Sequence, residues 1–127
     1  VQDDSVVFVE QYRPTIRETQ FELPAGIVEA GESFTAAAER ELREETGFAA
    51  GSTALLQDFW VATGLLRHRR WFVFATDLEP VEPDLDDNEF LSVRSVPVDE
   101  ALDVARAQPT NDATLEGVLL AREEGLL

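Results

Sequence analysis

The stretch that decides the fold is "GIVEAGESFTAAAERELREETGF", which runs from Gly26 to Phe48. It is typical of a loop that leads into a helix, and we expect the helix from about Ser33 to Thr46. Ser33 is a good N-cap, the alanines after it favour helix, and Gly47 can adopt the left-handed conformation that ends it. The stretch therefore predicts one loop-helix unit.

Three glutamates, Glu41, Glu44 and Glu45, fall within about 100° of one another near the end of this helix. Like charges at this spacing cost a helix roughly 0.2–0.5 kcal/mol, and carboxylates in the last turn oppose its dipole. A shared Mg²⁺ or Mn²⁺ ion, which prefers oxygen ligands, would make the arrangement favourable. The alternative is a solvated acidic face, in which Glu39 and Arg43 form an ordinary i,i+4 pair.

The stretch resembles the signature of the Nudix hydrolase family. That signature is a glycine, five residues, a glutamate and seven residues, followed by Arg-Glu-apolar-x-Glu-Glu-x-Gly-apolar. All nine positions match, at Gly26, Glu32, Arg40, Glu41, Leu42, Glu44, Glu45, Gly47 and Phe48.

The resemblance implies a role for each position. The metal ligands for Mg²⁺ or Mn²⁺ are the carbonyl of Ala25 and the side chains of Glu41, Glu44 and Glu45. Glu44 also counts as a candidate catalytic residue. The other positions are structural. Gly26 has no side chain and so leaves room for an ion or phosphate, and the pair of Glu32 and Arg40 pins the loop to the helix. Gly47 is the last structural position.

The fold class expected is α/β (α+β), as a Nudix-type α/β/α sandwich around a mixed β-sheet in a single domain over residues 1–127. The chain shows apolar segments of strand and helix character in alternation. Strands are expected at residues 6–12, 21–23, 55–62, 70–78 and 90–96, and further helices at 98–107 and 113–124.

The composition limits the partners. There are 26 acidic and 10 basic residues, all of the latter arginine, for a net charge of −16. Without a basic stripe, nucleic acid is not an expected partner, and no apolar run is long enough for a membrane span. The chain has no cysteine, which favours a cytoplasmic location, and its acidity favours a salt-rich, halophilic setting over a merely acidic protein. It also has no methionine, so we expect that an N-terminal segment precedes Val1.

Segments outside the signature resemble the ADP-ribose and nucleoside-diphosphate-sugar pyrophosphatases. They are "VVFVEQYRP", "ETQFELPAGIVEAGE", "DDNEFLSVRSVPVDEAL" and "NDATLEGVLLA". This implies hydrolysis of a nucleoside diphosphate linked to another group, such as ADP-ribose, and it allows a homodimer. In these enzymes the general base often lies in an acidic loop after the sheet, here Glu89, with Glu82, Asp86 and Asp87 as alternatives.

Candidate substrate-binding residues are Arg13, Glu22, Arg67 and Arg69. Arginine suits phosphate because its guanidinium can donate two parallel hydrogen bonds. The subfamily commonly has proline-glycine and then an acidic residue between the two central strands, whereas this chain has Thr63 and Gly64 with arginines nearby. These arginines could bind substrate phosphate, or they could instead pair with the acidic surface. Both tryptophans, Trp60 and Trp71, are expected to pack in the core, with stacking on a base of the substrate as the alternative. Two other functions stay open, hydrolysis of nucleoside triphosphates or dinucleoside polyphosphates, and nucleotide sensing without catalysis.

Overall fold

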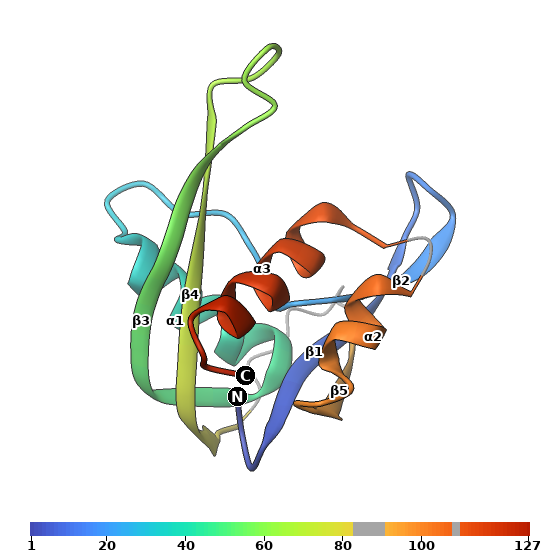
Figure 1. The fold of residues 1–127 in the computed structure, drawn as a ribbon. Helices are drawn as coiled ribbons and strands as arrows, with labels where there is room; N and C mark the ends of the chain where they lie inside the picture. The colour runs from blue at the N-terminus through green and yellow to red at the C-terminus, as the bar shows by residue number, and fades with distance from the viewer. Residues whose placement is uncertain (83–90, 108–109) are drawn as a thin grey trace.

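The computed structural model describes residues 1–82, 91–107 and 110–127 (Figure 1). Five strands and three helices follow one another along the chain. Their bounds are β1 Ser5–Arg13, β2 Glu18–Glu22, α1 Phe34–Thr46, β3 Phe48–Val61, β4 His68–Pro80, β5 Leu91–Pro97, α2 Ala101–Arg106 and α3 Asp112–Glu123. No helix among the described residues has the length and apolar character needed to cross a membrane.

The first sheet has the order β2-β1-β5, and β1 pairs with both neighbours in antiparallel fashion. Strand β1 is the centre of the fold, because Val6 to Val9 are all buried. Val6 and Phe8 pack with residues of α2 and α3, whereas Val7 packs with Leu42 of α1 and with Leu78 of β4. Alternate side chains of one strand thus face helices on opposite sides, which is the layering of an α/β/α sandwich.

The second sheet is a long antiparallel hairpin of β3 and β4, with paired residues from Phe48 and Pro80 at its base to Val61 and His68. Figure 1 shows the outer end of this hairpin projecting well beyond the rest of the chain. We call this outer end, residues 58–71, the arm. Its tip turns at Ala62, which has a positive φ of 49°.

The helix-and-strand class expected from the sequence is confirmed. The strands, however, divide between two sheets, and every strand pair among the described residues is antiparallel, so the mixed sheet is not seen there.

The predicted bounds of β3 were too short. The strand begins at Phe48, directly after the helix, although "AAGSTAL" has little β-propensity. Pairing with the apolar β4 overrides that weak local preference. Gly51 allows the close approach of the strands, since a Cβ there would lie 2.9 Å from the Cβ and the carbonyl oxygen of Asp77.

Candidate metal and substrate site

Helix α1 begins and ends as its sequence predicts. The hydroxyl of Ser33 accepts a hydrogen bond from the backbone N–H of Ala36 at 3.1 Å. At the other end, Gly47 has a φ of 71°, and its N–H donates to the carbonyl of Arg43. Because these caps fix both ends, the last two turns hold their glutamates at defined positions beside the preceding loop.

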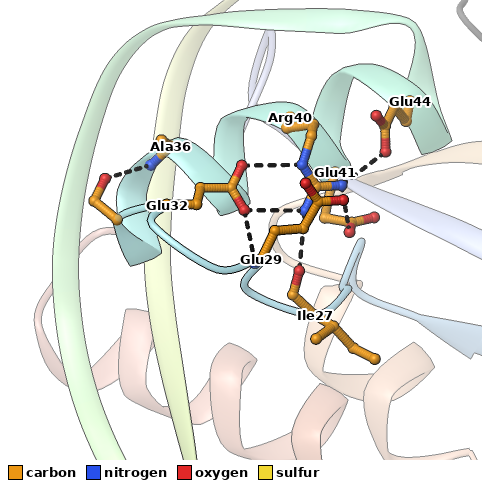
Figure 2. Close-up of polar contacts among 8 residues, drawn as sticks. Ile27, Glu29, Glu32, Ala36, Arg40, Glu41 and Glu44 are labelled. Carbon is orange, nitrogen blue, oxygen red and sulfur yellow. Dashed lines mark hydrogen bonds and ion pairs between the residues drawn. The ribbon is translucent and has the colours of Figure 1, made fainter.

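Arg40 is the centre of the polar contacts in this region (Figure 2). Its Nε and Nη2 donate to the two carboxylate oxygens of Glu32 at 3.0 and 3.2 Å. Its Nη2 also donates to the carbonyl of Ile27 at 3.0 Å. Its Nη1 donates to Glu41 at 2.7 Å and to Glu44 at 2.9 Å. One side chain therefore ties the loop to the helix and also holds two of the predicted metal ligands.

The Glu32 carboxylate is stabilised in its charged form. The hydrogen bonds from Arg40 lower the pKa of Glu32, and the backbone N–H of Glu29, 3.0 Å away, adds to the effect. The same contact with Glu32, followed by that with Glu41, raises the pKa of the Arg40 guanidinium. The pairing of Glu32 with Arg40 that the signature implies is thus present as a forked contact, the strongest geometry for this ion pair.

Gly26 makes room for the carboxylate of Glu41. A Cβ built on Gly26 would lie 1.9 Å from Cδ of Glu41 and 2.0 and 2.4 Å from its two carboxylate oxygens. The sequence predicted that this position stays bare for an ion or a phosphate. In the structure, the space beside Gly26 is occupied by the carboxylate of Glu41, which is itself a candidate metal ligand.

Glu45 is the most buried of the three glutamates, with 7% of its surface exposed. Its Oε2 accepts a hydrogen bond from the backbone N–H of Ala25 at 3.0 Å. This contact brings Glu45 next to the residue whose carbonyl is the fourth predicted ligand. The loop before Gly26 is held further by the hydroxyl of Thr114 in α3, which accepts from the N–H of Leu23 at 3.2 Å.

Arg13 and Glu22 form a second ion pair beside the first. The Nε of Arg13 lies 2.9 Å from Oε1 of Glu22, and Nη2 contacts the other oxygen, so the pair is forked. Glu22 is buried, with 8% exposed. This contact raises the pKa of Arg13, and the nearby charge of Glu45 contributes more weakly. Arg13 is therefore within electrostatic reach of the candidate metal site.

Arg67 and Arg69 lie on the arm. Both guanidinium groups are within 6 Å of the ring centre of Trp60, and Arg69 is also 5.2 Å from that of Trp71. Arg69 forms an ion pair with Asp58 as well. Trp71 in turn stacks on Phe34 at the start of α1, with ring centres 5.9 Å apart. The prediction that Trp60 packs in the core is wrong, since 55% of it is exposed.

A cavity of about 1020 Å³ connects these regions. Its lining includes Arg13, Glu22, Ala25, Gly26 and Glu41 from the loop-helix region, and Arg67 and Arg69 from the arm. All four predicted substrate-binding residues thus line one space together with part of the candidate metal site.

Other predicted residues fall elsewhere. Glu89, Asp86 and Asp87 lie outside the described residues, and Glu82 is exposed just after β4. The expected pair of Glu39 with Arg43 is not formed. Glu39 instead accepts from the hydroxyl of Thr53 at 3.1 Å, and no ion pair of Arg43 occurs within the described part of the chain.

The sequence did not indicate two contacts that position the site, the carbonyl of Ile27 and the hydroxyl of Thr114. Both depend on tertiary neighbours, and no residue pattern marks them.

The donor set fits a hard divalent cation, because it consists of carboxylate oxygens and a backbone carbonyl. Within residues 1–82, 91–107 and 110–127, however, no three acidic or histidine side chains already converge on one point as ligands. The contacts above give the reason. Glu41 and Glu44 are drawn to Arg40, and Glu45 to the backbone of Ala25.

Comparison with known proteins identifies the family. The family model for the NUDIX domain matches residues 1–118. The chain belongs to the Nudix family. It is 31% identical over 113 residues to an ADP-ribose pyrophosphatase of Bacillus subtilis, covering 87% of this chain and 61% of that protein. It is 34% identical to a mouse ADP-sugar pyrophosphatase, covering 78% of this chain and 48% of the relative.

The Nudix fold is also shown by a solved structure. A crystal structure of an ADP compounds hydrolase superposes with a TM-score of 0.89 at 27% identity, over 100% of this chain and 72% of that one. The chain spans only part of the length of its relatives, about 61% in the case of the Bacillus subtilis protein.

Proposed function

We propose that this Nudix chain hydrolyses the diphosphate bond of a nucleoside diphosphate linked to another group. The observation that carries the proposal is the placement of Glu41 over Gly26 with Glu45 buried against Ala25. Glu41 and the backbone of Ala25 and Gly26 lie on the wall of a cavity large enough for a nucleotide, and Glu45 contacts this wall through its hydrogen bond from Ala25. A solvated acidic face would not require a bare glycine under one of its carboxylates.

Glu41, Glu44, Glu45 and the carbonyl of Ala25 would hold Mg²⁺ or Mn²⁺. The ion supplies charge neutralisation for the diphosphate oxygens and lowers the pKa of bound water. The chain's own part is to fix its oxygen donors beforehand. Gly26 does this by leaving room for the carboxylate of Glu41, and the N–H of Ala25 does it by holding Glu45 beside the loop.

The general base in this proposal is Glu89, which would accept a proton from the attacking water at its carboxylate. This assignment rests on the family resemblance of the acidic loop alone. Glu44 is the second candidate, because it is the most exposed carboxylate of the site and could turn toward water. Glu89→Gln separates the two assignments. It should lose turnover while keeping its affinity for metal if Glu89 is the base, and it should keep turnover if Glu44 is the base.

Substrate phosphate would be held by Arg13, which Glu22 keeps in place through the forked contact. Arg67 and Arg69 would reach the group at the far end of the substrate. Two observations support these roles, namely that all four residues line the same cavity and that Arg67 has no carboxylate partner in the described part of the chain.

The favoured substrate is ADP-ribose, cleaved to AMP and ribose 5-phosphate, or a nucleotide sugar. The names of the relatives support this choice, since they are an ADP-ribose pyrophosphatase and an ADP-sugar pyrophosphatase. A homodimer, a cytoplasmic location and an adaptation to high salt belong to the same proposal. The net charge of −16 supports the last of these, because such a surface repels itself less when salt screens it.

The test is a product assay with ADP-ribose, nucleotide sugars, dinucleoside polyphosphates and nucleoside triphosphates, with Mg²⁺ at low and at molar salt. AMP and ribose 5-phosphate formed from ADP-ribose, and abolished by a chelator, are the expected result. Preference for a triphosphate or a dinucleotide would change the substrate but keep the chemistry. A folded protein that binds metal and turns over no member of the panel would overturn the proposal in favour of nucleotide sensing.

A further inference from the structure

The guanidinium of Arg40 lies where its Nη1 contacts two candidate metal ligands at once. The nitrogen is 2.7 Å from an oxygen of Glu41 and 2.9 Å from an oxygen of Glu44 (Figure 2). Two carboxylates from successive helical turns thus share one positive group. This is the arrangement that a bound cation would otherwise provide, and it coincides with the absence of converged ligands among the described residues.

The rest of the guanidinium is anchored elsewhere. Its Nε and Nη2 bind Glu32, and Nη2 also binds the carbonyl of Ile27. Three of the five contacts therefore belong to the loop, and only those of Nη1 involve metal ligands. Losing the Nη1 contacts would leave Arg40 in its place, because the loop contacts do not depend on them.

We propose that Arg40 is the internal counter-cation of the metal site. Its Nη1 neutralises Glu41 and Glu44 in the metal-free protein, and a divalent cation binds by taking these two carboxylates from it. The inference rests on the proposed function, since it assumes that these carboxylates are metal ligands. It adds that metal binding is an exchange of partners, which Arg40 opposes.

The charges explain why such an exchange is needed. Three carboxylates, those of Glu32, Glu41 and Glu44, contact one guanidinium, in a chain that already carries −16. Without metal, the repulsion among them is offset mainly by Arg40. The positive charge of the Arg40 guanidinium repels a divalent cation that binds beside it. Arg40 therefore stabilises the metal-free protein and weakens its affinity for metal.

The test compares metal affinity in Arg40→Gln, in the unchanged protein and in Arg43→Gln, without substrate. Arg43 is the matched control, because it lies on the same helix, is exposed and has no ion pair within the described part of the chain. Calorimetric titration with Mn²⁺ should show binding about tenfold tighter in Arg40→Gln, since two charged hydrogen bonds no longer compete. Arg43→Gln should stay within about twofold. Thermal unfolding in chelator should show a lower Tm for Arg40→Gln and a larger gain on adding Mn²⁺.

If Arg40→Gln does not fold without metal, the unchanged protein still gives an answer. Side-chain ¹⁵N NMR should show that the Nη1 protons of Arg40 lose protection from exchange when Mg²⁺ is added, while the Nε proton on Glu32 keeps it. Nη1 contacts that persist with Mg²⁺ bound would overturn the inference.

Weaker or unchanged binding in Arg40→Gln would also overturn it, and weaker binding would mean that Arg40 only orients the ligands. If Arg40→Gln binds metal no more tightly but the unchanged protein still shows metal-dependent hydrolysis, the inference fails and the proposed function stands. An unchanged protein that binds no metal would overturn both.

Discussion

The loop-helix region, residues 26–48, and the arm, residues 58–71, border the same cavity but are built in different ways. In the loop-helix region, Arg40 contacts four residues, and Glu32 accepts hydrogen bonds both from Arg40 and from the backbone of Glu29. On the arm, arginines lie over tryptophan rings, and apolar side chains face solvent, with Leu65 89% exposed. The base of the arm is tied to the helices, since Arg70 forms ion pairs with α3 and Trp71 stacks on Phe34, whereas side chains nearer the tip, such as Leu65, have more freedom to change.

The difference suggests where the chemistry and where the selectivity lie. A network in which each carboxylate has a fixed partner suits groups that must be placed accurately, as metal ligands must. A stacking surface on a projecting hairpin tolerates many shapes and suits the variable part of a substrate. Substitutions with equal effects on turnover and stability in the two regions would contradict this difference.

The largest effect is expected for Glu45→Gln. The amide can still accept the hydrogen bond from Ala25, so the fold should persist, but the charged ligand is lost. Turnover with metal should fall by more than about 100-fold, because loss of a ligand should exceed the 10–100-fold loss typical of its outer-shell partners. The Tm in chelator should stay the same or rise, because one buried charge is gone. Glu39→Gln is the control, since Glu39 lies on the same helix and binds only Thr53 in the contacts described. Equal losses in both variants would contradict the assignment of Glu45 as a ligand.

The next largest effect is expected for Gly26→Ala, with Gly64→Ala as its control. The new methyl group at residue 26 meets the carboxylate of Glu41, whose flexible side chain can move aside, so the fold should hold while the ligand is displaced. Metal affinity and turnover should drop by about 10–100-fold. At Gly64, in the tip of the arm, a Cβ meets nothing within 4 Å, and no effect on either is expected. Titration with Mn²⁺ and the product assay check both variants.

The third prediction concerns pH. Arg40 holds the pKa of Glu32 below its ordinary value of about 4.5, so the charged carboxylate stabilises the fold. This stabilisation is complete above the ordinary pKa and is lost as the pH falls through the lowered value in the folded protein. Glu32→Gln should therefore have a lower Tm at pH 7 and a flatter decline of Tm between pH 5 and acid unfolding. A decline as steep as that of the unchanged protein would show that other carboxylates control it.

The fold class predicted from the sequence is confirmed, whereas the roles of the site residues stay predictions. The capped helix followed from its residue types, and the Glu32–Arg40 pair followed from the resemblance to the Nudix signature. The full extent of β3 did not follow, because its first half is specified by the partner strand. The contacts of Arg40 with Glu41 and Glu44 were not predicted either. They depend on which of several nearby acceptors one long side chain binds.

The smallest effect is expected for Asp58→Asn on the arm. Asp58 forms an ion pair with Arg69, but both side chains are more than a third exposed, at 38% and 44%. Water and salt screen such a pair, so its loss should cost less than about 1 kcal/mol in the free energy of unfolding, and less still at molar salt. Arg69 also keeps its contacts with the two tryptophan rings. Urea unfolding of Asp58→Asn and Glu32→Gln, side by side at two salt concentrations, measures the contrast directly. A loss at Asp58 as large as that at Glu32 would mean that the arm is as tightly built as the loop-helix region, and that selectivity cannot be assigned to it on grounds of tolerance.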